Sequence, residues 1–232
     1  MPDAPVLPAA PGPTGTVAVH LSRLDEPGTD TAAEAYSALL TPDERARAGR
    51  MPPAEQAVWS RSRVLLRTVV ARQLGCAARE VRLGRDPYGR PVLPDAPTLH
   101  ISLSHTTGCC AVAVSTQGPV GVDVEWVRPV SVPDGLARRI LGSAELRDWE
   151  RVPGPHRTRW LLRRWTWKEA LLKAEGLGLR GGLRSFAVRP TPAGLRVSGT
   201  RHRPDGWRLY EIPAGSRHVA AVAHDRRAAA TH

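Results

Sequence analysis

The chain has 232 residues, of which 41% are apolar and 24% charged, with 21 glycines and 22 prolines. This composition is typical of a globular protein with many turns, and it excludes a fibrous or wholly disordered chain. No apolar run approaches the ~20 residues that a transmembrane helix needs, so we expect no membrane partner. The opening segment 1–15 has neither a basic start nor an apolar core, and we interpret it as a loose tail rather than a secretory signal.

The formal net charge is +11, and only two of the 33 basic residues are lysines, Lys168 and Lys173. A positive balance of this size indicates an anionic partner, which could be nucleic acid, a phosphorylated small molecule or an acidic protein. The sequence contains no zinc finger, no aromatic RNA-binding strand motif and no basic heptad region, so nothing supports nucleic acid in particular.

The three cysteines, Cys76, Cys109 and Cys110, have no CxxC spacing that would suit zinc. Adjacent cysteines rarely form a disulfide with each other. We therefore expect reduced cysteines and a cytoplasmic protein.

The first half of the chain predicts helices followed by strands. Alternating residues and 3.6-residue stripes separate the two kinds of element. We expect a strand over 16–23, a helix over 34–50 that breaks near Pro42, a longer helix over 54–75, a short strand over 81–85, a turn over 86–91, and strands over 99–103 and 109–115 joined by a loop over 104–108.

The second half repeats this order. We expect a strand over 120–125, short helices over 134–141 and 143–151 with Ser143 as the N-cap of the second, a long helix over 156–175, and further strands over 184–224. The strand sequences AVAVS (111–115) and VAAVA (219–223) are similar. This similarity favours an α+β fold made of two similar halves.

Two carboxylates are predicted to share one face of the strand Gly121-Val122-Asp123-Val124-Glu125. Residues i and i+2 of a strand project to the same side, which leaves Val122 and Val124 on the other side. Two neighbouring carboxylates repel unless a positive charge lies between them, and Mg²⁺ prefers such oxygen ligands. A solvated strand face is the alternative interpretation of this pattern.

The chain's two lysines lie in the long helix. Lys168 falls within its apolar stripe and must therefore reach the surface or find an anion. Glu169 and Lys173 are spaced i, i+4 and should meet on one side of the helix. A surface ion pair is the ordinary explanation of that spacing.

Three further groups could bind phosphate. The Ser104 hydroxyl and the His105 imidazole lie near a glycine, as in a phosphate cradle, although they could equally belong to an ordinary polar loop. Arg47 follows a predicted helix start, and Arg85 and Arg90 flank a turn. Arginine forks suit phosphate oxygens, but each of these arginines could also be a solvated surface residue.

Together these motifs resemble those of the surfactin-type 4′-phosphopantetheinyl transferases. That family carries G-(I/V)-D-(I/V)-E and, further along, W-x-x-K-E-(A/S)-x-x-K. This chain has Gly121 to Glu125 and Trp165-x-x-Lys168-Glu169-Ala170-x-x-Lys173 in the same order. Upstream, Gly89-Arg90-Pro91 and Leu103-Ser104-His105 also match family elements, and the similarity covers about 38–224.

The resemblance implies transfer of the phosphopantetheine group from coenzyme A to a serine of an apo carrier protein, as in secondary metabolite biosynthesis. It implies that Asp123, Glu125 and Glu169 hold Mg²⁺ with the pyrophosphate. Lys173 would contact the pyrophosphate, and Glu169 is the candidate general base.

The resemblance also implies a set of coenzyme A ligands: Arg47, Arg85, Arg90, Ser104 and His105. Glu44 occupies a position where some members carry a basic residue. The implied carrier is acidic, which suits 128–164, where nine arginines stand against four acidic residues.

The family fold implies two α+β halves related by a pseudo-twofold axis, with the active site at their interface, in a monomer that binds neither nucleic acid nor membrane. We place the halves at 16–118 and 119–225, between tails at 1–15 and 226–232. Two other hypotheses are a non-catalytic nucleic-acid binder and a Mg²⁺-dependent phosphohydrolase that uses the same three carboxylates.

Overall fold

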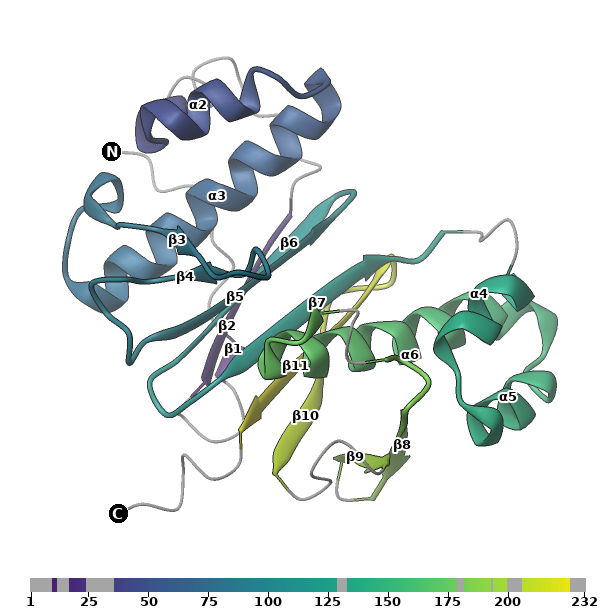
Figure 1. Ribbon diagram of the computed structural model, residues 1–232. Helices are drawn as coiled ribbons and strands as arrows, with labels where there is room; N and C mark the ends of the chain where they lie inside the picture. The colour runs from purple at the N-terminus through teal and green to yellow at the C-terminus, as the bar shows by residue number, and fades with distance from the viewer. Residues whose placement is uncertain are drawn as a thin grey trace.

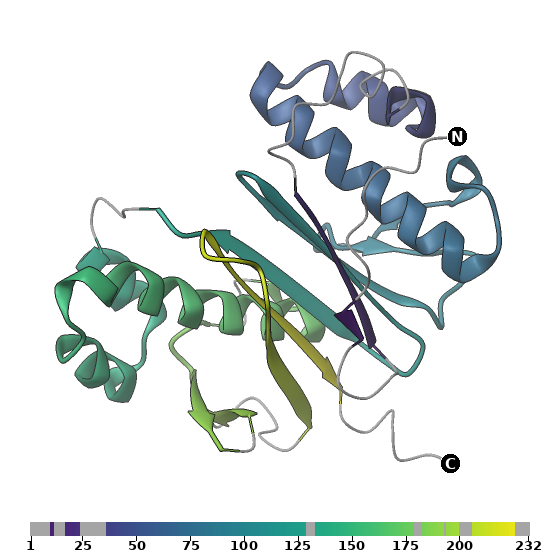
Figure 2. The same cartoon turned by 180° about the vertical axis from the view of Figure 1, so that it is seen from behind.

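The computed structural model describes residues 10–11, 17–23, 36–128, 133–178, 182–192, 194–199 and 206–225. Most of the expected N-terminal tail and the whole C-terminal tail lie outside these ranges. Two β-sheets lie at the centre of the molecule, with α2 and α3 on one side of them and α4 to α6 on the other (Figures 1 and 2). The predicted α+β class is confirmed.

The first sheet has the strand order β1-β2-β6-β5. The long helix α3 begins at a proline and ends at Gly75, whose φ of 67° is the left-handed conformation that favours glycine at a helix end. The elements of the first half are β1 (Ala10–Pro11), β2 (Val17–Arg23), α2 (Pro42–Ala48), α3 (Pro53–Leu74), the 3-10 turn Ala78–Glu80, the small hairpin β3 (Gly84–Arg85) and β4 (Pro91–Val92), β5 (His100–Thr106) and β6 (Cys109–Ser115).

The second sheet has the order β7-β11-β10-β9-β8. Helix α6 crosses it and ends at Gly176, which has a φ of 72°. The elements of this half are β7 (Val120–Trp126), α4 (Pro133–Ile140), α5 (Ser143–Glu150), α6 (Gly154–Glu175), β8 (Phe186–Thr191), β9 (Gly194–Gly199), β10 (Trp207–Ile212) and β11 (His218–Asp225).

The two halves share one topology. Each has a first strand, a 22-residue helix and then a hairpin whose last strand inserts beside the first strand, giving β2-β6-β5 and β7-β11-β10. The similar sequences at 111–115 and 219–223 lie on the equivalent central strands β6 and β11. The repeat inferred from those sequences is therefore confirmed in the fold.

Side chains alternate between two cores along each central strand, as the pleat requires. On β6, Cys110, Val112 and Val114 pack under α3. The intervening residues of β6 face the opposite side and pack against valines of β7 and β11, in a core that lies between the two sheets. The layers therefore run helix, sheet, sheet, helix, and the edge strands β5 and β7 lie side by side where the halves meet.

Four expectations about elements are corrected. Ser104, His105 and Thr106 are strand residues, because β5 keeps its pairing with β6 up to Thr106 and the turn contains only Thr107 and Gly108. Gly142, not Ser143, is the N-cap of α5, since the Glu145 carboxylate accepts from its N–H. The expected strand over 81–85 is reduced to Gly84–Arg85, and α3 begins at Pro53 and not at 54.

Candidate active site

The motif residues of β7 and α6 face each other because these two elements approach very closely. Gly121 makes this possible: a Cβ atom at this position would lie 2.0 Å from the carbonyl oxygen of Ala170 and 2.4 Å from the amide nitrogen of Ala174. Any side chain would therefore collide with the α6 backbone. The first glycine of the strand motif thus sets the distance between β7 and α6.

Asp123 is the centre of the site. It is 4% exposed, and its Oδ1 accepts from Lys173 Nζ at 2.7 Å and from Ser104 Oγ at 2.8 Å. Lys173 Nζ also donates to the carbonyl of Val122 at 3.2 Å. Lys173 thus forms its ion pair across the interface with β7. Its charge also acts on Glu169, four residues earlier on the same helix, where it opposes the rise in the pKa of that carboxyl.

Glu125 and Glu169 flank Asp123. Burial raises the pKa of each of these carboxyls to about 7, and the charge of Asp123 adds to both shifts. Trp165 Nε1 donates to Glu125 Oε1 at 3.0 Å, whereas the buried Glu169 Oε1 and Asp123 Oδ2 have no hydrogen-bond partner. Three carboxyl groups therefore share a site that has too few donors for their oxygens.

These residues fit a hard cation. Among the described residues no three histidine, cysteine or acidic side chains are already grouped closely enough to hold a metal ion. The two unpartnered buried oxygens and the mutual repulsion of the carboxylates are nevertheless what an oxygen-binding divalent cation would relieve. Asp123, Glu125 and Glu169 as its ligands stay a prediction.

The predicted coenzyme A residues lie at two distances from Asp123. Ser104 touches it. Partial burial lowers the pKa of the His105 imidazole, and the nearby ammonium charge of Lys173 adds to this shift. Arg90 Nε donates to Asp86 Oδ2 at 3.1 Å. Its guanidinium reaches the other half, where a Cβ at Gly176 would lie 3.2 Å from Arg90 Nη1.

Arg47 and Arg85 lie on the outer part of the first half. Arg47 is exposed over the ring of Trp59, with its Cζ 5.5 Å from the ring centroid. Arg63 lies over the same ring. Burial lowers the pKa of Arg63, and the nearby charge of Arg85 adds to this shift. The two predicted arginines thus belong to one basic region, and within the described residues neither forms an ion pair with the three carboxylates.

Sequence reasoning missed the partners of two buried charged groups, Glu44 and Lys168. Glu44 is buried and accepts from Arg63 Nη2 and Arg67 Nε, both at 2.8 Å. Lys168 is fully buried and finds its anion in Glu145, 2.5 Å away. The signal for Lys168 was its place in an apolar stripe; nothing in the sequence indicated which acidic residue would meet it.

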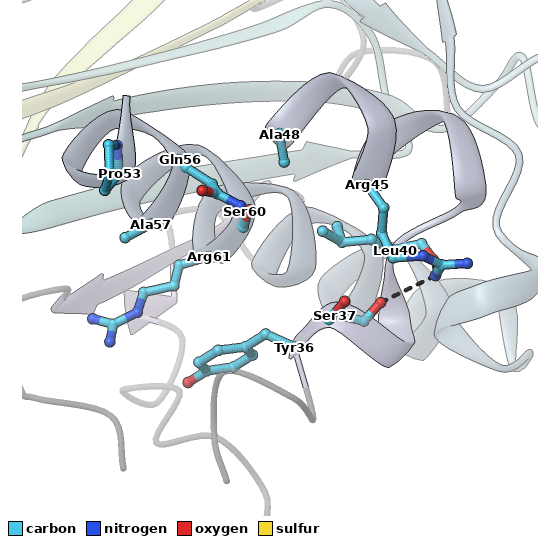
Figure 3. Close-up of a pocket in the computed structure, with 10 residues that line it drawn as sticks. All are labelled: Tyr36, Ser37, Leu40, Arg45, Ala48, Pro53, Gln56, Ala57, Ser60 and Arg61. Atoms are coloured by element: carbon cyan, nitrogen blue, oxygen red, sulfur yellow. Dashed lines mark hydrogen bonds between the residues drawn. The ribbon is translucent and has the colours of Figure 1, made fainter. Parts of the chain in front are cut away.

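Several cavities in the described part of the chain lie outside this cluster, and two of them lie in or beside the first half. One, of about 310 Å³, opens between α2, α3 and residues 36–40 and contains no predicted site residue (Figure 3). The other, of about 350 Å³, lies where the halves meet; its lining includes Arg90, Pro91, His100, Pro119 and Val120. Of these two, the second includes a predicted site residue, Arg90, in its lining.

Comparison with known proteins identifies relatives that cover most of the chain. The family model of the 4′-phosphopantetheinyl transferase superfamily matches residues 119–223. The chain is 29% identical over 205 residues to the 4′-phosphopantetheinyl transferase Sfp of Bacillus subtilis, covering 87% of this chain and 90% of that protein. It is 31% identical over 211 residues to the 4′-phosphopantetheinyl transferase HetI of Nostoc sp., covering 88% and 86%.

Among solved structures, a holo-[acyl-carrier-protein] synthase of Thermotoga maritima aligns with a TM-score of 0.38 and 25% identity, over 45% of this chain and 61% of that one. The chain belongs to the 4′-phosphopantetheinyl transferase family. It is an enzyme of that class, which transfers the 4′-phosphopantetheine group of coenzyme A to a carrier protein. No helix in the described part of the chain is long and apolar enough to cross a bilayer.

Proposed function

We propose that this enzyme is of the surfactin type, depends on Mg²⁺, and modifies a serine of an apo peptidyl or acyl carrier protein as a monomer in the cytoplasm. The observation that carries the proposal is the cluster at the border of the halves, where Asp123 meets Lys173 and Ser104 between two further carboxyl groups. A single chain, in two halves divided near residue 118, supplies all of these groups.

Asp123, Glu125 and Glu169 would hold the ion together with the pyrophosphate of coenzyme A. When bound, Mg²⁺ neutralises charge on the phosphate oxygens. The carboxyls of Glu125 and Glu169 have a raised pKa because they are buried beside Asp123, so a cation would be expected to displace their protons.

The transfer needs positioning and charge stabilisation more than covalent help from the protein. The serine hydroxyl oxygen attacks the phosphorus that carries the pantetheine arm, and the bond from that phosphorus to the bridging oxygen breaks. Adenosine 3′,5′-bisphosphate leaves with the bridging oxygen. The ammonium of Lys173 would stabilise the charge that develops on this leaving group.

Glu169 would accept the proton of the carrier serine. Its buried Oε1 has no hydrogen-bond partner among the described residues, so the ionised carboxylate could accept a proton there. Glu125 is less suited to this role because Trp165 already donates to one of its oxygens.

Coenzyme A would lie along the border of the two halves. Arg90 and the cavity beside it connect the first half with the end of α6, and His105 lies near Lys173. Arg85 and Arg47 would extend this basic track toward the 3′-phosphate. Arginine forks bind phosphate oxygens in this manner.

A basic surface for the carrier lies on α4 and α5. Arg138 and Arg139 of α4 and Arg147 of α5 are exposed, and Arg151 follows directly after α5. An acidic carrier would be attracted to this surface at low ionic strength. The preferred carrier class is to be found with a panel of apo carriers.

The direct test combines purified protein, Mg²⁺, coenzyme A and several apo carriers, with the carrier mass as the readout. Transfer adds one phosphopantetheine to the carrier, and Glu169→Gln should abolish this gain. Phosphate release without any carrier would favour the phosphohydrolase instead. Strongly salt-dependent DNA binding that Asp123→Ala leaves unchanged would favour the nucleic-acid binder.

A further inference from the structure

Side-chain hydroxyls of β5 take the place of backbone carbonyls at the border between the halves. Three alternate residues of β5 accept from backbone N–H groups of β7: Ser102 Oγ from Val122 at 3.0 Å, Ser104 Oγ from Val124 at 3.3 Å and Thr106 Oγ1 from Trp126 at 3.4 Å. The residue numbers rise together, so the strands run parallel. We call these three residues the β5 hydroxyl ladder.

The ladder satisfies N–H groups that would otherwise be buried without partners at the edge of the second sheet. It also fixes the register between β5 and β7, because each hydroxyl meets one particular amide. The position of the motif strand relative to the first half thus depends on these side chains.

Ser104 differs from the other two members because it also contacts a candidate catalytic group. Its hydroxyl donates to Asp123 Oδ1 at 2.8 Å while it accepts from Val124 N–H. A serine hydroxyl has one donor, so this bond uses its whole donor capacity. Lys173 donates to the same Oδ1, and the second oxygen, Oδ2, is left buried without a partner.

We propose that Ser104 is a positioning residue that orients the Asp123 carboxylate, with Oδ1 held by two donors and Oδ2 left available for the metal ion. The inference rests on the proposed metal role of Asp123. It differs from the coenzyme A contact expected for Ser104. Ser104 is only 7% exposed. Its hydroxyl would have to release Asp123 before it could donate to a phosphate.

Ser102 provides a matched control. It lies two residues earlier on the same strand, is 3% exposed and accepts the same kind of bond from β7, but no contact with a carboxylate is described for it. A purely structural role of the ladder therefore predicts similar behaviour for Ser102→Ala and Ser104→Ala. A positioning role predicts different behaviour.

The experiment titrates Mg²⁺ into the substrate-free proteins by calorimetry and measures kcat and KM for coenzyme A separately. We expect Ser104→Ala to weaken Mg²⁺ binding by ~10-fold or more, as loss of an outer-shell partner does, and to lower kcat more than it changes KM. Ser102→Ala should leave the Mg²⁺ affinity within about 2-fold of the parent, whatever its effect on the unfolding temperature.

A second variant separates the hydrogen bond from packing. Ser104→Cys keeps the shape of the side chain but has only a weak donor, so it should share the loss of Mg²⁺ affinity. Unchanged Mg²⁺ binding in Ser104→Ala or Ser104→Cys overturns the inference, as does an equal loss in Ser102→Ala. A rise in KM alone would instead assign Ser104 to coenzyme A. No Mg²⁺ binding by the parent protein would refute the proposed metal site itself, and the inference with it.

Discussion

Gly121 of β7 and Ala170 of α6 are in such close backbone contact that a Cβ atom on the glycine would lie 2.0 Å from the alanine carbonyl oxygen. This contact brings the helix that carries Glu169 and Lys173 against the strand that carries Asp123. The distance between the two motifs, and hence the site, depends on the absence of one side chain.

The first prediction is that Gly121→Ala destabilises the fold and impairs transfer. The added methyl group meets backbone rather than a flexible side chain, so α6 or β7 must shift. Overpacking of this kind costs typically ~1–3 kcal/mol and occasionally more. Urea unfolding measures the loss, and the carrier modification rate measures the effect on the site.

Gly154→Ala is the control for this substitution, because nothing lies within 4 Å of a Cβ at Gly154. It should leave both the free energy of unfolding and the transfer rate close to those of the parent. Parent-like stability of Gly121→Ala would contradict the close approach of β7 and α6.

The second prediction concerns Lys168, which is fully buried and donates to Glu145 and to the carbonyls of Ile140, Leu183 and Phe186. Lys168→Met leaves the buried Glu145 without its cation, and breaking such a pair costs ~3–5 kcal/mol. We expect a large drop in the free energy of unfolding by chemical denaturation. Lys168→Arg should also lower the free energy of unfolding, because all four acceptors converge on one nitrogen atom, which a guanidinium cannot reproduce.

Replacing both partners, as in Lys168→Met with Glu145→Leu, should recover part of that loss, since the unpaired charge is removed with its partner. Recovery stays incomplete because Glu145 also accepts from the N–H groups of Gly142 and Val188. Equal stability of Lys168→Met and the parent would show that the pair does not join α4 and α5 to α6.

Local sequence patterns predicted part of the fold and part of the site correctly. The alternation in Gly121 to Glu125 correctly placed Asp123 and Glu125 on one face and the valines on the other, because the pleat has a fixed period. The similar strands at 111–115 and 219–223 correctly indicated a repeat. Both are local patterns that folding preserves.

The remaining contacts depend on which distant segments meet. Nothing near Lys168 indicates that Glu145, 23 residues earlier, is its partner, and nothing near Ser104 indicates that β7 lies beside it. The loop expected over 104–108 was wrong for the same reason: pairing with β6 extends β5 to Thr106 despite its polar residues. Tertiary pairing outweighs local propensity here.

The third prediction is a pH dependence of stability and of metal binding. The carboxyls of Glu125 and Glu169 have a pKa of about 7, above the ordinary value, so between their unfolded and folded pKa the folded protein binds more protons than the unfolded one. The free energy of unfolding of the metal-free protein should therefore fall as the pH rises from ~5 to ~8. Thermal unfolding in chelator at several pH values measures this.

Mg²⁺ should reverse that trend, because the ion replaces the protons on the carboxyls. The rise in unfolding temperature on adding Mg²⁺ should be larger at about pH 8 than at about pH 6. The double variant Glu125→Gln with Glu169→Gln removes both groups and should lose both effects. A stabilisation by Mg²⁺ that is independent of pH would argue against displaced protons.

The fourth prediction concerns Trp165, whose indole N–H holds Glu125. Trp165→Phe removes that bond and keeps most of the ring, and a loss of ~10-fold in Mg²⁺ affinity is expected for such an outer-shell partner. Calorimetric titration measures it. Trp160→Phe, on the same helix but packed near Trp149, should leave the affinity unchanged.

We infer that transfer requires the carboxylate of Asp123, which lies at the border of the two halves. The most direct measurement is the mass of an apo carrier after incubation with coenzyme A, Mg²⁺ and either the parent protein or Asp123→Asn, whose side chain has the same shape but no charge. The parent should add one phosphopantetheine per carrier, and Asp123→Asn should add none in the same time. Modification by Asp123→Asn at the parent rate would contradict this requirement.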